Sequence, residues 1–380
     1  MNNSARHNSV LSNTLWSTRR HIIKLAEFIS RKTSFLDGLK NKLGISNAIL
    51  KILAPSVKPD KVEEIKKKLN THYIEDKVAE YSRKNLTPDF WIVLTRSMGD
   101  IVACEPISRH LKMIAPASKV HWIVLKQFAE VLEANPFIDD IVAVNTMAEG
   151  KAIAQAQASS NGSCIVVDCH FDGTSDPTTN RIFDNPINPE VNVHTYYFIG
   201  SLLETFSVSA GLPMLNDAPI FHIRKNIALP FAVKNAAIFH CCASETCRNW
   251  DSTKWNLLAE QLTHKGFSVV EIGTERILRE MPNVIDYTGY KSIQQIAAIM
   301  KSSTLFVGVD SVFAHVANAL QIHSVILLGK FRNFSVYFPY SGAFSRSQSF
   351  RVIRAPKNQP AYGISLDEVF NAIQSFEHRL

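Results

Sequence analysis

A Gly-Asp pair, Gly99-Asp100, follows a short apolar segment, Phe90–Thr95, and precedes an apolar helical pattern. Glycine permits a tight turn and the close approach of a ligand, and a carboxylate at a helix start can be a general base for a hydroxyl nucleophile. The simpler alternative is that Asp100 only caps its helix. Ligands of open α/β sheets bind outside the carboxyl ends of strands, which favours a site at this turn.

A second candidate site lies between the predicted strand Ala237–His240 and a helical segment, residues 254–265. Ser244 and Thr246 offer hydroxyls, Arg248 offers a fixed cation, and the helix N-terminus offers free N–H groups. That set suits a diphosphate. Adjacent cysteines make poor joint metal ligands and no second pair lies nearby, so we expect no metal at the cysteines of this segment, Cys241, Cys242 and Cys247.

Further polar residues follow predicted strands in the second half of the chain. Glu275 could accept hydrogen bonds from ribose hydroxyls, as an acidic residue does at the strand end of nucleotide folds, or could be a solvated loop residue. Asp310, Ser311 and His315 cluster on the first turns of a predicted helix, where the simpler interpretation is an Asp N-cap with a core histidine. A Thr-Gly turn and a lysine stand near the same end of the sheet: Thr288, Gly289 and Lys291.

These sites require a scaffold in which strands and helices alternate. Short segments rich in strand formers recur from residue 90 onward, with helical patterns between them: Phe90–Thr95, Val120–Leu125, Ile141–Val144, Cys164–Asp168, Ala237–His240, Ser268–Ile272, Thr304–Val309 and Ser324–Leu328. Such alternation predicts parallel sheets with helices on both faces. We expect an irregular loop at 172–192, a helix through Tyr197–Phe206, a linker near Ile223–Phe231 and a last helix at Leu366–Phe376.

Composition and charge exclude several classes of protein. The chain is 46% hydrophobic and 20% charged, which is typical of a globular protein and not of a disordered one. No segment reaches the roughly 18 apolar residues of a membrane-spanning helix, and Met1–Ser12 lacks the apolar segment of a secretory signal. Six cysteines without paired spacing favour a reducing compartment.

The net charge of +7 comes from one end of the chain. Residues 1–88 hold 17 Lys and Arg against 8 Asp and Glu, whereas the remaining residues hold 24 against 26. The residue pattern of this basic segment predicts helices. The segment either packs on the main body or presents a basic face, with Arg19–Lys32 and Lys61–Lys68, to anionic lipid.

The order and spacing of the motifs resemble glycosyltransferase family 9, the ADP-heptose:lipopolysaccharide heptosyltransferases, over roughly residues 90–330. Five segments carry the resemblance: Ser97–Pro106, Ala134–Val142, Arg248 with Trp250 and Trp255, Thr288–Ile293, and Val307–Leu320. Val312 stands where family members usually have Gly, Lys330–Phe334 replaces a Pro-rich loop, and residues 1–88 have no counterpart.

The resemblance implies an α/β fold of the GT-B type, with two Rossmann-like domains whose parallel sheets face a cleft, plus a helical N-terminal extension. The implied domains are a basic helical extension, 1–88, an acceptor-binding domain, 89–228, a nucleotide-sugar-binding domain, 229–362, and a C-terminal helix that packs back on the N-terminal domain, 363–380.

The resemblance also implies metal-independent, inverting transfer of a sugar, heptose from ADP-heptose, to a lipopolysaccharide-type or other surface glycan, without a cofactor. Asp100 would be the general base, and Arg248 would neutralise the departing diphosphate. The implied donor contacts are Ser244, Thr246, Arg248, Glu275, Thr288, Gly289, Lys291, Asp310, Ser311 and His315. Those implied for the acceptor are Arg96, Ser97 and Gly99.

Two other functions stay open at this point. The same fold could glycosylate a protein hydroxyl, or the chain could be a non-catalytic nucleotide-binding or scaffold protein, which Val312 and the altered loop at 330–334 would suit. The expected partners are a nucleotide-sugar donor, a glycan or glycolipid acceptor and an anionic membrane surface bound by residues 1–88, but not nucleic acid. The expected location is the cytoplasm, peripheral to the inner face of the inner membrane.

Overall fold

The computed structural model describes residues 59–376, apart from 161, 232–234, 332–333, 335–336, 346–349 and 357–358. The expectations for residues 1–58, including lipid contact by Arg19–Lys32, lie outside the described residues. From the basic segment the structure describes two helices, α4 (Pro59–Lys68) and α5 (Tyr73–Arg83), as the sequence predicted. Within the described ranges no helix combines the length and the apolar character needed to cross a membrane.

The first sheet has four parallel strands in the order β3-β2-β1-β4. The strands are β1 (Asp89–Val93), β2 (Val120–Leu125), β3 (Asp140–Val144) and β4 (Cys164–Asp168). Alternate side chains of β1 enter two separate clusters: Phe90 and Ile92 belong to the large core, and Val93 packs with Ile123 on the opposite face. Burial of both faces explains why the strand sequences are apolar without alternation.

One helix of the first half of the chain, α8, lies very close to the first sheet. The helices of this half are α6 (Met98–Ala103), α7 (Pro106–Ile114), the 3-10 helix η1 (Lys126–Val131), α8 (Met147–Ser159), α9 (Tyr196–Ile199) and α10 (Leu202–Ser209). A Cβ atom at Gly150 of α8 would lie 2.8 Å from Ile123 Cγ2 and 3.3 Å from Thr95 Cγ2. Glycine at this position therefore lets α8 contact the sheet at the end of β1.

The second sheet has six parallel strands in the order β12-β11-β10-β7-β8-β9. They are β7 (Ala236–His240), β8 (Ser268–Gly273), β9 (Val284–Thr288), β10 (Leu305–Val309), β11 (Ser324–Leu328) and β12 (Phe350–Arg354). The helices α11 (Ser252–His264) and α14 (Leu366–Gln374) contact this sheet, as does α13 (Val312–Leu320), and α12 (Ile293–Lys301) packs on α13. A two-stranded antiparallel ribbon, β5 (Thr174–Ser175) with β6 (Ile182–Phe183), lies in the predicted loop.

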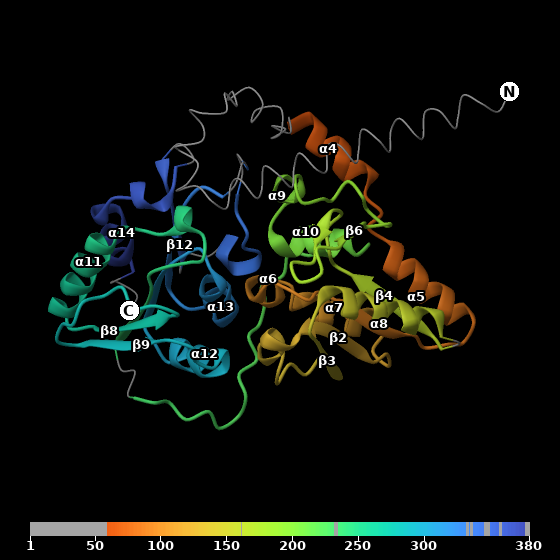
Figure 1. Cartoon of the computed structure of the whole chain (residues 1–380), viewed down its shortest axis with the longest axis horizontal. Helices are drawn as coiled ribbons and strands as arrows, with labels where there is room; N and C mark the ends of the chain where they lie inside the picture. Colours follow the sequence, from red (N-terminus) through yellow and green to blue (C-terminus); the bar gives the residue numbers. More distant parts are fainter. Residues whose placement is uncertain are drawn as a thin grey trace. The chain divides into compact units, whose positions relative to one another are not determined.

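The expected fold class is confirmed: two parallel α/β sheets, each with its own helices (Figure 1). Three details differ from the prediction. The edge strands β9 and β12 were not predicted, because their sequences are more polar than those of the central strands. The helix expected at Tyr197–Phe206 is divided at Gly200, since Ser201 and Glu204 form a capping box that starts a new helix. The segment near Phe128 is a 3-10 helix, η1.

The last helix corrects another expectation. Helix α14 packs on β11, β12 and α11 of the second sheet, whereas the sequence analysis expected it to pack back on the N-terminal domain. Val369, Ile373 and Phe376 are buried in the second sheet's own core, and this apolar stripe fixes the position of the helix. The domain boundaries at 88, 228 and 362 stay predictions.

Glu130 of η1 connects the first sheet's helices to α12. Its carboxylate accepts hydrogen bonds from the Ser292 hydroxyl and, at 3.2 Å, from the Ile293 N–H. Arg224 lies 3.2 Å from the same carboxylate, and the Gln294 side chain donates to the Glu130 carbonyl at 3.0 Å. A carboxylate at a helix N-terminus is favourable because it pairs with free N–H groups and the helix dipole.

We predict that Glu130→Ala lowers the free energy of unfolding by about 1–2 kcal/mol, since it removes a helix cap and leaves the Ile293 N–H without its partner. Urea unfolding followed by circular dichroism measures this loss. Glu64→Ala is the matched control, because Glu64 pairs with Lys68 on the exposed surface of α4, where solvent screens the pair and its loss should change the free energy of unfolding much less. Equal losses for the two variants would contradict the assigned role of Glu130.

Candidate functional site

Asp100 lies in the first turn of α6 and forms a capping box with Ser97. Ser97 is the N-cap, and its N–H donates to Asp100 Oδ2 at 3.0 Å. Asp100 is therefore not the N-cap itself, although it does help to cap the helix. Burial raises the pKa of the Asp100 carboxyl, and Ser97, Arg248 and Arg96 act against that shift. A carboxylate with a raised pKa is a stronger base than a solvated one.

Arg248 and Asp310 form a buried ion pair on the second sheet. Arg248 Nη1 lies 3.2 Å from Asp310 Oδ2 and donates to the Asp310 carbonyl at 3.3 Å. Asp310 also accepts hydrogen bonds from the hydroxyls of Tyr337 and, at 2.7 Å, Tyr340. The guanidinium lies over the Phe331 ring, with Cζ 4.4 Å from the ring centroid. Arg248 is thus held in one place by the residues around it.

The Arg248 guanidinium is protonated and positively charged at all ordinary pH values. Burial acts against the charged guanidinium, but Asp310, Tyr337 and Glu245 together offset this and raise the pKa of Arg248. The side chain is 19% exposed, so part of it still contacts solvent. It can therefore present positive charge to an anionic ligand while Asp310 fixes its orientation.

Helices α6 and α13 bring the two halves of the site together (Figure 1). A Cβ atom at Gly99 would lie 3.1 Å from His315 Cδ2 and 3.6 Å from the Val312 Cα atom. The absence of a side chain at Gly99 permits this approach. Asp100 comes close enough to Arg248 for the guanidinium to lower the pKa of Asp100. Asp100 and Arg248, expected in separate domains, therefore lie within electrostatic reach of each other.

Ser311 and His240 meet at the start of α13. Ser311, and not Asp310, is the N-cap of this helix, and its hydroxyl accepts from the Phe313 N–H at 3.2 Å. Ser311 Oγ is also hydrogen-bonded to His240 Nδ1 at 2.9 Å. Sequence analysis placed His240 only at the end of a strand. Because it is buried under Phe313, its role depends on tertiary contacts that sequence patterns do not show.

The other predicted donor residues lie along the carboxyl ends of β7, β8 and β9. Ser244, Thr246, Glu275 and Lys291 are exposed. The Thr288 hydroxyl donates to Asp286 at 2.7 Å, and the Gly289 N–H donates to the Gly273 carbonyl at 2.9 Å. None of their described contacts reaches the Arg248–Asp310 pair. On the acceptor side, Arg96 is half-buried and Ser97 is exposed.

Trp250 and Trp255 hold the loop that carries Arg248. The Trp250 indole N–H donates to the Ile364 carbonyl at 2.8 Å, and that of Trp255 donates to the Cys241 carbonyl at 3.1 Å. Both rings are buried and pack edge to face. The tryptophans of this motif therefore fix the loop and are not exposed to a ligand.

The structure adds site residues that the sequence analysis missed. Tyr337 and Tyr340 contact Asp310 from a distant aromatic segment, and only the unusual composition of the loop near residue 330 indicated that this region differs. In the described part of the chain, no group of three or more His, Cys, Asp and Glu side chains is arranged to hold a metal ion.

We predict that stability falls in mild acid because of His240 and His315. Burial lowers the pKa of His240 to about 3 and that of His315 to about 4. Between pH 6.5 and these values the unfolded chain binds protons that the folded chain does not. The free energy of unfolding is therefore highest above pH 6.5 and falls as the pH is lowered. Each histidine should account for a loss of about 2 kcal/mol between pH 7.5 and pH 5.

Urea unfolding at pH 7.5 and pH 5 measures this effect. In His240→Gln the difference in unfolding free energy between the two pH values should shrink by about 2 kcal/mol. His72→Gln, at a ring that is 70% exposed, should leave the difference unchanged. An undiminished difference in His240→Gln would show that His240 binds a proton in the folded protein.

With this geometry established, comparisons with known proteins address the family. Residues 210–341 match the model of glycosyltransferase family 9 (heptosyltransferase). No curated protein is similar enough in sequence to match.

Solved structures show the same fold. A family 9 glycosyltransferase of Veillonella parvula has 15% identity and a TM-score of 0.56, with 77% of this chain and 98% of that one covered. E. coli heptosyltransferase WaaC with ADP has 16% identity and a TM-score of 0.53, with coverage of 76% and 98%. E. coli ADP-heptose lps heptosyltransferase II has 14% identity and a TM-score of 0.57, with coverage of 77% and 100%.

The matched region, residues 210–341, includes Arg248, Asp310 and His315, and the fold around Asp100 is that of heptosyltransferase structures. The resemblance to glycosyltransferase family 9 that the sequence predicted is thereby confirmed over residues 210–341, and similar solved structures show the same fold.

Proposed function

We propose that this enzyme transfers heptose from ADP-heptose to a hydroxyl of a lipopolysaccharide-type or other surface glycan, with inversion and without a metal ion or cofactor. The observation that carries the proposal is the electrostatic proximity of Asp100 to Arg248, beside the contact between α6 and α13. One group can accept a proton and the other can stabilise a departing diphosphate. The ADP and ADP-heptose named with similar heptosyltransferase structures support this donor.

In this proposal Asp100 accepts the proton of the acceptor hydroxyl as its oxygen attacks the anomeric carbon. The bond from that carbon to the diphosphate breaks, and ADP leaves with the electron pair. Arg248 lies where it can stabilise the new negative charge, a role that a metal ion fills in other transferases. A single displacement of this kind inverts the anomeric centre.

The remaining predicted contacts fit the two substrates. Ser311 and the N-terminus of α13 can hold diphosphate oxygens, because helix starts present free N–H groups. The residues along the carboxyl ends of β7, β8 and β9 then bind the rest of the donor: Ser244, Thr246, Glu275, Thr288, Gly289 and Lys291. Arg96, Ser97 and Gly99 lie beside the base and are assigned to the acceptor. The basic segment 1–88 would contact an anionic membrane from the cytoplasmic side.

One observation favours a second candidate, a non-catalytic nucleotide-binding protein. The Asp310 carboxylate already has three partners, Arg248, Tyr337 and Tyr340, and so has little capacity left for a sugar hydroxyl. A donor screen separates the two functions. ADP binding by calorimetry without transfer or hydrolysis of any ADP-, UDP- or GDP-sugar would favour the second.

We predict that Asp100→Asn lowers kcat about 10²- to 10⁴-fold, the usual contribution of a general base. The amide keeps the size of the side chain but cannot accept the proton. ADP affinity should change less than about threefold, since the base contacts the acceptor. Transfer from ADP-heptose to a truncated lipopolysaccharide measures kcat, and calorimetry measures ADP binding.

Asp367→Asn is the matched control, because Asp367 also lies in the first turn of a helix, α14, away from the site. It should leave kcat unchanged. Full turnover by Asp100→Asn would remove Asp100 from its proposed role.

A further inference from the structure

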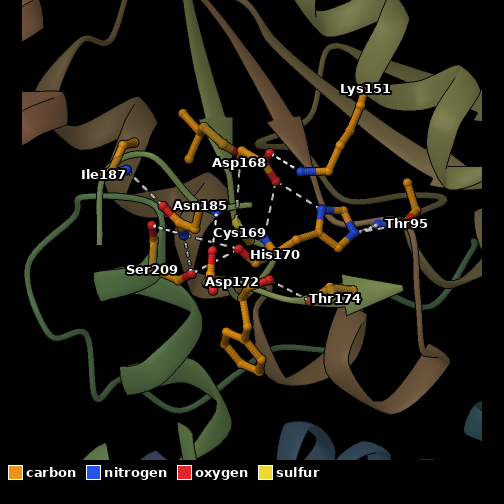
Figure 2. A network of polar contacts seen from close by, with 12 residues as sticks. Thr95, Lys151, Asp168, Cys169, His170, Asp172, Thr174, Asn185, Ile187 and Ser209 are labelled. Atoms are coloured by element: carbon orange, nitrogen blue, oxygen red, sulfur yellow. Dashed lines mark hydrogen bonds and ion pairs between the residues drawn. The ribbon is translucent and has the colours of Figure 1, made fainter. Parts of the chain in front are cut away.

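A chain of polar contacts, half-buried at Lys151 and Asp168 and buried at His170 and Thr95, lies at the carboxyl ends of β1 and β4, and the proposed mechanism does not use it (Figure 2). Lys151 of α8 pairs with Asp168, the last residue of β4. Asp168 Oδ1 accepts from His170 Nδ1 at 2.9 Å, and His170 Nε2 lies 3.0 Å from the Thr95 hydroxyl. Since Val93 and Asp168 are register partners on adjacent strands, both ends of this chain of contacts are fixed by the sheet.

The protonation of this network follows from its partners. Burial acts against charge on Asp168, but the His170 hydrogen bond and Lys151 hold the pKa of that carboxyl well below its usual value. Burial lowers the pKa of His170, although Asp168 acts against the shift. His170 is therefore neutral with its proton on Nδ1, facing the carboxylate. Its Nε2 is left as the acceptor for the Thr95 hydroxyl and, at 3.5 Å, for the Thr95 N–H.

Thr95 is held on every side. Its carbonyl accepts from the Leu125 N–H at 3.1 Å, its hydroxyl and N–H face His170, and Gly150 of α8 leaves room for its methyl group. Thr95 follows directly on β1, and only Arg96 separates it from Ser97, the N-cap that bonds Asp100. A shift at Thr95 would therefore move the capping box and the carboxylate of Asp100 with it.

The opposite side of His170 is anchored as well. Its carbonyl accepts from the Asn185 side chain and from the Ser209 hydroxyl, each at 3.1 Å. The Cys169 N–H donates to the Val93 carbonyl at 3.1 Å. Asn185 belongs to the segment predicted as an irregular loop, and these contacts tie that loop to α10. His170 therefore has little freedom to follow Thr95, and it fixes the position of Thr95 instead.

We propose that His170, oriented by Asp168, is a positioning residue that places Asp100 for proton transfer by holding Thr95 at the end of β1. The inference rests on the proposed function of Asp100. Burying the Lys151–Asp168 pair brings an unfavourable desolvation term, so such a pair is weak evidence for stability alone. Its use here is geometric, because a base displaced by about 1 Å can lose about 10²-fold in rate.

The test compares two replacements of similar size. His170→Asn can keep the donor that faces Asp168 but has no acceptor for Thr95, whereas His170→Gln can place its amide oxygen near Thr95. We expect kcat to fall 10- to 100-fold in His170→Asn and less than fivefold in His170→Gln. The KM for ADP-heptose and the Kd for ADP should change less than threefold, since neither His170 nor Thr95 is among the proposed donor contacts.

Variants of Thr95 complete a double-mutant cycle. Thr95→Val removes the hydroxyl and should reproduce the loss of His170→Asn, Thr95→Ser should restore the rate, and the double variant Thr95→Val with His170→Asn should be no slower than either single one. Thr205→Val is the matched control, because it removes another buried hydroxyl of the first domain that donates to the Ser201 carbonyl at 2.8 Å. It should leave kcat unchanged.

Three results would overturn the inference: unchanged kcat in His170→Asn and Thr95→Val, losses that multiply in the double variant, or an equal loss in Thr205→Val. Calorimetry with ADP and circular dichroism establish that each variant is folded. Inactive Asp100→Asn together with active His170→Asn would reject this inference and retain the proposed function. No transfer by the unaltered protein would reject both.

Discussion

The close approach of α6 and α13 at Gly99 is the constraint on which the site depends. The two helices belong to different sheets, and a side chain at position 99 would press against His315. Because the contact forms, Asp100 at the start of α6 lies within electrostatic reach of Arg248. Glu130 of η1, which accepts from the Ile293 N–H at the start of α12, connects the helices of the two sheets at a second place. A glycine in one helix turn thus permits the close approach of the two helices.

Each sheet also holds a paired carboxylate at or just after a strand end. Asp168, half-buried at the end of β4, pairs with Lys151 and His170, whereas the buried Asp310 pairs with Arg248 and two tyrosine hydroxyls. Burial of a charge is unfavourable unless the charge is paired and its oxygens accept hydrogen bonds. Both carboxylates meet that condition, and each therefore fixes a neighbouring group: a histidine on one sheet, a guanidinium on the other.

The sequence predicted what depends on local pattern. The central strands, the turn before Asp100 and the helix after Asp310 were located correctly. Apolar strand segments and helix starts can be recognised from residues that are neighbours in the sequence. The partners Tyr337 and His170 were not found, since they reach the site through contacts between distant segments. The loop at 172–192 has no periodicity, yet Asn185 and its neighbours make it ordered. Helix α14 was placed on the wrong domain because the family resemblance alone supplied its partner, and the apolar stripe of the helix does not identify the surface it covers.

Two of the departures from the family pattern, Val312 and the segment Lys330–Phe334, lie beside the second sheet, and the structure explains them physically. Val312 stands where family members usually have Gly, but even a Cβ atom added at Gly99 would lie 3.6 Å from the Val312 Cα atom, so the close approach of α6 is kept. The segment after Lys330 supplies Phe331 under Arg248 and, further on, the tyrosines that bond Asp310. The altered loop and the retained charges therefore form one unit: the aromatic residues hold the ion pair that a donor diphosphate would meet.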